Sequence, residues 1–218
     1  MTTFTATDPF GHPLTLQHAD SAAAVNGFIT GFLNYTPSIL AALPAADSDD
    51  SLMVQTCAAV LWMFSESPAG PPKARAHLAR ARAANLPATE RERRFAEAVA
   101  RWVDGDLASA IALHTALAHD HPRDLAAIKL GQYHAFNLGD APTLLKLALP
   151  AVAAAGFRAV ARCGCGLAAA WLQCPTGAWM RLLPAAALLA GGLHSVWARA
   201  WPVGAMPSQQ IGRASCRE

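Results

Sequence analysis

The chain has 218 residues, of which 17 are basic and 15 acidic, and its formal net charge is +2. It is long enough to bury a core without a disulfide or a metal, and its charge balance argues against nucleic acid or an anionic membrane as a partner. The five cysteines are odd in number and unevenly spaced, which argues against the disulfide framework of a small secreted protein.

The first twenty residues lack the features of a secretory signal. They hold two aspartates, two histidines and two prolines, with no basic start and no continuous apolar core. Two later stretches without charged residues, 163–180 and 182–198, barely reach the length of a membrane span and are interrupted by Gly, Pro or His. We therefore expect a cytoplasmic protein with reduced cysteines and no membrane-spanning segment.

Helical patterns fill the first 140 residues, whereas alternating strand patterns are almost absent, so we expect negligible strand content. The predicted helices cover residues 21–33, 51–64, 73–84, 89–103, 107–119 and 123–138. Asn85 can end the third in a left-handed conformation, and Thr89 with Glu92 has the spacing of a capping box for the fourth. Gly105 and Asp106 then provide a tight turn and an N-cap for the next helix.

The glycine–aspartate turn occurs twice in the chain. Gly105-Asp106 recurs as Gly139-Asp140 after 34 residues, which is the period of a tetratricopeptide array. Small residues within such helices allow the two helices of a hairpin to approach closely. The positions that we assign to the repeat are Ala76, Gly105, Asp106, Ala110, Pro122, Asp124, Gly131, Gly139 and Asp140. The sequence thus predicts an all-α fold of antiparallel helix pairs, stacked as a tetratricopeptide-like superhelix over residues 1–150.

Longer motifs accompany the repeat. They are Glu90-Arg91-Glu92-Arg93, Trp102 with Gly105-Asp106, Pro122-Arg123-Asp124, and Phe136 with Gly139-Asp140, preceded by Gly11, Asn26 and Tyr35. With these motifs, residues 8–150 resemble the tetratricopeptide repeat protein 38-like family, although the usual aromatic residues of the repeat are not at their expected places. The resemblance implies an α-helical superhelix with an interaction role, and it implies neither catalytic residues nor a cofactor.

The composition changes after residue 140. The 77 residues from 141 to 217 contain no Asp or Glu, whereas the first 140 contain 14. Such a bias is typical of GC-rich DNA translated out of frame, and the final "IGRASCRE" matches a translated sequencing adapter. Our hypothesis is that residues 151–218 form a tail that is largely out of frame, with an adapter-derived end at 211–218 and no function.

Two clusters of polar residues are candidate sites of chemistry. His114 and His119 are five residues apart, which is not the spacing of a metal-ligand pair on a helix, so we interpret them, with His121 and His134, as polar surface and linker residues. Glu90, Glu92 and Glu97 alternate with arginines, a pattern that indicates a solvated ladder of i,i+4 pairs. We predict no metal and no cofactor.

The predicted function is therefore a non-catalytic scaffold that binds a protein or a peptide. The alternative is the N-terminal part of an enzyme whose active site lies in a C-terminal half that this chain lacks. In a repeat array the first helix of each unit lines the concave face, which gives the candidate contact residues Glu92, Trp102, Lys129, Tyr133 and Asn137. An incomplete array also exposes its stacking face, which favours self-association.

Overall fold

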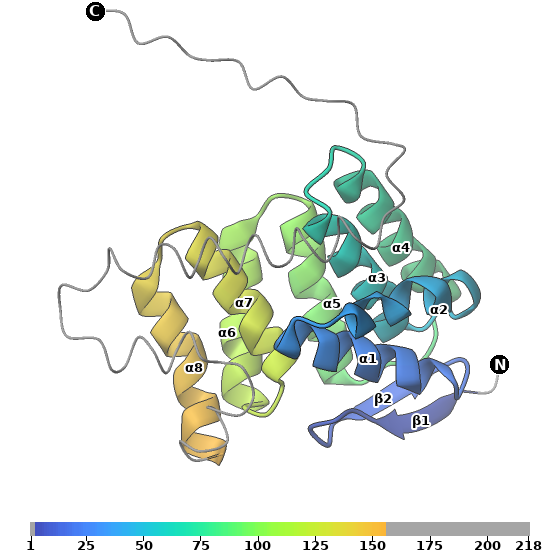
Figure 1. Cartoon of the computed structure of the whole chain (residues 1–218), viewed down its shortest axis with the longest axis horizontal. Helices are drawn as coiled ribbons and strands as arrows, with labels where there is room; N and C mark the ends of the chain where they lie inside the picture. The colour runs from blue at the N-terminus through green and yellow to red at the C-terminus, as the bar shows by residue number, and fades with distance from the viewer. Residues whose placement is uncertain (1–2, 156–218) are drawn as a thin grey trace, which may run out of the picture.

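Helix pairs follow one another along the computed structural model, which describes residues 3–155 (Figure 1). The chain begins with a hairpin of β1 (Phe4–Thr7) and β2 (Pro13–Leu16). The helices are α1 (Ser21–Asn34), η1 (Pro37–Ala41, a 3-10 helix), α2 (Ala42–Ser48), α3 (Leu52–Phe64), α4 (Gly70–Ala84), α5 (Glu90–Val103), α6 (Leu107–Asp120), α7 (Leu125–Asn137) and α8 (Ala141–Ala155). The predicted all-α class is confirmed.

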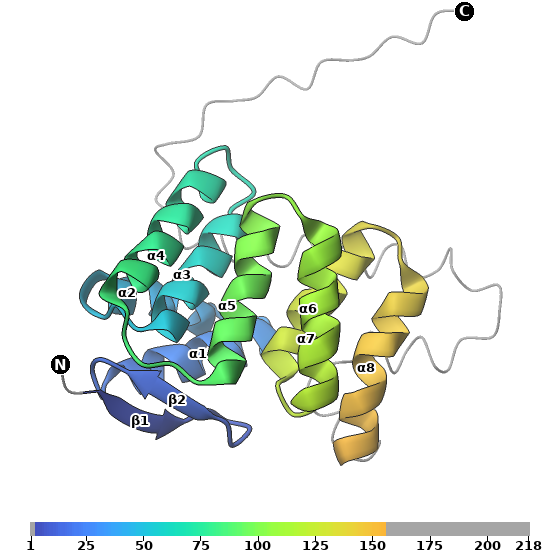
Figure 2. The ribbon, with the colours of Figure 1, turned by 180° about the vertical axis from the view of Figure 1, so that it is seen from behind.

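The stack is built from the pairs α3–α4, α5–α6 and α7–α8. Successive pairs are joined through contacts of α3 with α5 and of α6 with both α7 and α8. Seen from behind, α4, α5 and α6 lie side by side in chain order, with α8 beyond α6 (Figure 2). Helix α8 continues through Pro150, so the boundary that we predicted near residue 150 falls inside it. The tail that we predicted over residues 151–218 therefore begins inside α8, and its residues from 156 onward lie outside the described part of the chain.

Two glycine turns connect the helices of the later pairs, as the repeat predicted. Gly105 has a φ of +84° and Gly139 a φ of +69°, conformations that residues with a Cβ rarely adopt. Nothing lies within 4 Å of the position that a Cβ would take at either glycine. These two glycines are therefore required by the backbone conformation and not by close packing.

An aspartate caps each of the last three helices. The side chains of Asp106, Asp124 and Asp140 each accept a hydrogen bond from the amide three residues later, that of Ser109, Ala127 and Thr143 respectively. The hydrogen bonds from Ser109 and Thr143 also lower the pKa of Asp106 and of Asp140 below the ordinary value for aspartate. Local sequence thus determines where these helices begin.

The repeat register holds at Ala110 but not at Ala76. Ala110 is fully buried against the neighbouring helices, whereas Ala76 is exposed on α4 and Ala74 takes the buried position. The prediction that Ala76 lies between two helices is therefore wrong. The buried stripe of α4 consists of Ala74, Leu78 and Ala81. This helix is therefore rotated about its axis relative to the orientation that a strict 34-residue period predicts.

The N-terminal hairpin was not predicted. Its strands pair antiparallel from Phe4 opposite Leu16 to Thr7 opposite Pro13. Leu14 and Leu16 are fully buried, so one face of β2 belongs to the core. Four residues give too short an alternation to be recognised in a sequence, and a two-stranded hairpin is stable only when it packs on something else. Here β2 packs on α3 and α1.

No helix within residues 3–155 has the length and apolar character needed to cross a membrane.

Candidate functional site

The face that we predicted to be an open groove is filled by the chain itself. We call the side of α3, α5 and α7 that carries Phe64, Trp102 and Tyr133 the inner face. Helix α1 packs across it, against α3 and α7 (Figure 1). The Phe32 ring of α1 lies 5.4 Å from that of Phe64, which in turn lies 5.5 Å from Trp102 and 5.1 Å from Tyr133. Aromatic packing of this kind makes α1 part of the core.

Lys129 of α7 holds the C-terminal end of α1. Its Nζ donates hydrogen bonds to the carbonyl oxygens of Phe32, at 2.7 Å, and Leu33, at 2.9 Å. The same ammonium lies 3.8 Å from the centroid of the Tyr35 ring. A cation at this place is favoured by both the free carbonyls and the dipole of the helix. Lys129 is buried, so its charge is used within the fold.

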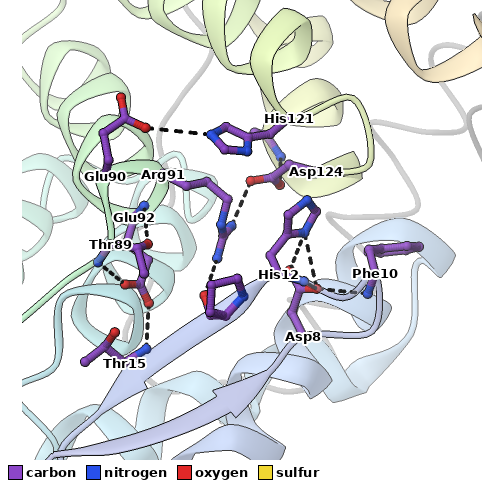
Figure 3. A network of polar contacts seen from close by, with 12 residues as sticks. Asp8, Phe10, His12, Thr15, Thr89, Glu90, Arg91, Glu92, His121 and Asp124 are labelled. Atoms are coloured by element: carbon purple, nitrogen blue, oxygen red, sulfur yellow. Dashed lines mark hydrogen bonds and ion pairs between the residues drawn. The ribbon is translucent and has the colours of Figure 1, made fainter. Parts of the chain in front are cut away.

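Glu92 of α5 holds β2. Its carboxylate completes the predicted capping box by accepting a hydrogen bond from the Thr89 amide at 2.7 Å. The other oxygen accepts one from the Thr15 amide at 2.9 Å, and the side chain is fully buried. A residue that caps its own helix therefore also attaches the hairpin to the helix pairs (Figure 3).

Beside Glu92, a buried ion pair joins α5 to the start of α7. An Arg91 Nη atom lies 2.8 Å from an Asp124 carboxylate oxygen, and both side chains are almost completely buried. The second Nη of Arg91 donates to the Pro13 carbonyl at 3.3 Å, so the guanidinium also contacts β2 (Figure 3). Asp124 is the N-cap of α7, and its charge is therefore shared between an arginine and a helix N-terminus.

The hairpin loop adds an aspartate and a histidine to this region. Asp8 accepts hydrogen bonds from the amides of Phe10 and His12 and lies 3.0 Å from His12 Nδ1. Burial raises the pKa of Asp8, but the hydrogen bonds from His12 outweigh it and leave this pKa below its ordinary value. The His12 ring meets His121 edge to face at 6.1 Å, and His121 Nε2 lies 3.7 Å from Glu90.

We call Asp8, His12, Arg91, Glu92 and Asp124 the polar junction. It brings together residues of three of the sequence motifs, namely those around Gly11, Glu90 to Arg93 and Pro122 to Asp124. The expectation that the acid and arginine run of α5 is a solvated ladder is correct for the pairs Glu90–Arg94 and Glu97–Arg101. It is wrong for Arg91 and Glu92, which are buried because β2 and α7 cover them.

The five predicted contact residues thus have different environments. Glu92 and Lys129 are buried and hydrogen bonded to the N-terminal segment, which corrects the prediction that they line an open groove. Trp102 and Tyr133 pack mainly in the aromatic cluster of the inner face. Asn137 is exposed at the end of α7, where its side chain forms a hydrogen bond with Tyr133.

Two histidines also differ from the prediction. His119 is exposed and His121 is half-buried, as expected for surface and linker residues. His114 and His134 are instead buried beside each other, with ring centroids 5.6 Å apart. Their positions on the inward sides of α6 and α7 match the apolar stripes of those helices, and this is the signal that could have placed them in the core.

The side chains of residues 3–155 form neither of two kinds of reactive site: a metal-binding group or an activated thiol. Within residues 3–155, no group of three or more His, Cys, Asp or Glu side chains is placed to hold a metal ion. Burial raises the pKa of the Cys57 thiol far above neutral, so this sulfur is protonated and a poor nucleophile. Comparison of the chain with protein-family models, with curated proteins and with solved structures returned no match.

Proposed function

We propose that this chain is a cytoplasmic helical-repeat scaffold that binds a protein or a peptide, and that the binding surface is the end of the stack formed by α7 and α8. The observation that carries the proposal is the distribution of exposed apolar side chains. Four of the five large hydrophobic residues exposed within residues 3–155 belong to this end, at 38% for Phe136, 56% for Leu138, 38% for Leu145 and 49% for Leu149.

The contacts of α8 indicate what kind of partner fits there. Its inward face packs on α6 and α7 through Leu144, Leu147, Ala148 and Ala151. Leu145 and Leu149 lie one helical turn apart on the neighbouring face and form a second apolar stripe. Within the described residues, the α3–α4 pair is extended by α5 and the α5–α6 pair by α7, and each of these helices packs its buried residues on the preceding pair. The expected ligand is therefore an amphipathic helix with apolar residues at i, i+3 and i+4.

The test is a selection of helical peptides from a random library of 20-residue sequences displayed on phage, with the full chain as bait. We expect enriched peptides to carry an apolar i, i+3, i+4 stripe and to lose at least tenfold in affinity for Leu145→Asp/Leu149→Asp. The matched control is Lys146→Asp, which changes the charge of an exposed residue between the two leucines.

Peptides that bind the wild type and the leucine variant equally would contradict the proposed surface, and a selection that enriches nothing would contradict the function. Sedimentation at several concentrations identifies a competing occupant. Dimers that disappear in the leucine variant would show that a second copy of the chain covers this surface instead of a partner protein.

A further inference from the structure

The two buried histidines lie at the joint between the α5–α6 pair and the α7–α8 pair. His114 is in α6 and His134 is in α7, and their exposed fractions are 0% and 1%. Each histidine ring faces the other and also an aromatic side chain. The centroid of His134 lies 4.7 Å from that of Trp102, and His114 lies 6.0 Å from Phe95. The pair is therefore enclosed between α5, α6 and α7.

None of the four ring nitrogens has a hydrogen-bond partner among the described residues. Buried polar atoms are normally paired, and four unpaired nitrogens in two neighbouring side chains are unusual. A neutral imidazole tolerates this environment as an aromatic ring with one weak donor and one acceptor. An imidazolium would bring two strong donors and a positive charge that nothing nearby could accept.

Among the described residues, no charged group outside the pair contributes to the pKa shift of either ring, so none offsets this cost. The side chains that face it are Phe95 and Trp102 from α5 and Tyr133 from α7, while Leu147 of α8 packs beside Gly131. Within residues 3–155, Tyr133 is the one titratable side chain among these ring contacts, and burial raises its pKa, so it stays neutral. Burial likewise lowers the pKa of His114 to about 3, with a further contribution from His134, and that of His134 to about 4.

Helices α6 and α7 pack closely at the base of the His114 side chain. At Gly131 of α7, an added Cβ would lie only 2.7 Å from the Cβ of His114. The backbone of α7 therefore packs directly on the base of the His114 side chain. Water can reach a protonated ring only if α7 moves away from α6.

We propose that the His114–His134 pair is an acid-sensitive joint, at which protonation separates the α7–α8 pair from the α5–α6 pair while the rest of the stack remains folded. Both histidines titrate near pH 6.5 once the joint is open and well below this value while it is closed. The closed joint is therefore fully stable above about pH 6.5 and loses stability as the pH falls from there through about 4, the pKa of His134, toward about 3, the pKa of His114.

The size of the effect follows from this difference in pKa. At pH 5, each histidine favours the open state by about 30-fold relative to pH 7.5, and the two together by on the order of a thousandfold. Because α8 and the end of α7 form the proposed binding surface, acid would loosen that surface first. The inference on the joint stands on the histidine pair alone and does not depend on the proposed ligand.

Amide hydrogen exchange of the full chain at pH 7.5 and pH 5.0, corrected for the intrinsic pH dependence of exchange, tests the joint. We expect the opening constant of α7 and α8 amides to rise by on the order of a thousandfold, and that of α3 amides by far less. His114→Phe/His134→Phe should abolish most of this difference, whereas His119→Phe, at an exposed site, should leave it unchanged.

Three outcomes would overturn the proposal. The first is an equal rise for α3 and α7, which would indicate global acid unfolding. The second is an unchanged acid response in the double variant, or in His134→Leu if the double variant does not fold. The third comes from an NMR titration of the wild-type chain, in which a His114 or His134 ring that is protonated near pH 6.5 without opening of α7 would show that the folded joint tolerates the charge.

Discussion

The polar junction and the histidine pair are two buried polar regions that follow opposite rules. In the polar junction, Arg91 and Asp124 form a buried ion pair, so each side chain has a partner at hydrogen-bonding distance. In the histidine pair, His114 and His134 are buried to the same degree, and no ring nitrogen has a partner among the described residues. Burial therefore preserves charge where partners exist and removes it where they do not.

The polar junction and the histidine pair therefore have different roles in the fold. The polar junction attaches β2 and the start of α7 to α5. A substitution that breaks its contacts should therefore lower the free energy of unfolding considerably at any pH near neutral. The histidine pair forms no directional bond, so replacing a ring by an apolar one should cost little at neutral pH. The following substitutions test this contrast, from the largest expected effect to the smallest.

Arg91→Leu should lower the free energy of unfolding by about 3–5 kcal/mol, because it leaves the Asp124 carboxylate buried without its partner. Chemical denaturation followed by circular dichroism measures the loss. Arg91→Leu/Asp124→Ser should recover at least about 1 kcal/mol, since serine retains the N-cap of α7 without the charge. Arg101→Leu, at an exposed ion pair on the same helix, should change stability by less than about 1 kcal/mol. Equal effects of the two single substitutions would show that the buried pair has no special importance.

Lys129→Met should destabilise the chain by about 2–3 kcal/mol, because two carbonyls at the end of α1 lose a charged donor. Hydrogen exchange should locate the increased opening in α1, far from the substituted helix in sequence. Lys146→Met on the exposed side of α8 serves as the control. If α1 amides were equally protected in both variants, α1 would be held on the inner face by its aromatic contacts alone.

Glu92→Gln should cost about 1–2 kcal/mol, because one of the amides of Thr15 and Thr89 then faces an NH2 group instead of an oxygen. The matched change Glu97→Gln affects an exposed i,i+4 pair on the same helix and should cost less than about 0.5 kcal/mol. Thermal unfolding of both variants gives the comparison. A loss no greater than that of Glu97→Gln would mean that the hairpin contributes little to stability.

His134→Phe should change the free energy of unfolding by less than about 1 kcal/mol at pH 7.5, in either direction, because no hydrogen bond is lost and the greater apolar burial of the phenyl ring offsets the cost of its larger size. Denaturation at pH 7.5 provides the measurement. A loss as large as that of Arg91→Leu would indicate that His134 makes an essential polar contact, and the contrast between the two regions would then fail.

Local sequence determined much of the fold. The capping box of Thr89 and Glu92, the left-handed Asn85 and the turns at Gly105 and Gly139 are found where the sequence predicted them. Each depends on a few consecutive residues, because a cap or a tight turn is decided by the φ of one residue and the nearest amides. The helix start at Asp106 was predicted in the same way, and those at Asp124 and Asp140 depend on the same local cap, although the sequence analysis did not assign them as N-caps.

The tertiary structure alone decided which polar residues of those helices face inward. Glu92 and Lys129 look like surface residues in a helical sequence, but each is covered by an element that is distant in the chain: β2 covers Glu92 and the end of α1 covers Lys129. The periodicity of a helical sequence shows which face of the helix is apolar, but it does not show which element packs against that face. Whether a polar side chain on that face is paired, or kept neutral, depends on contacts that only folding brings together.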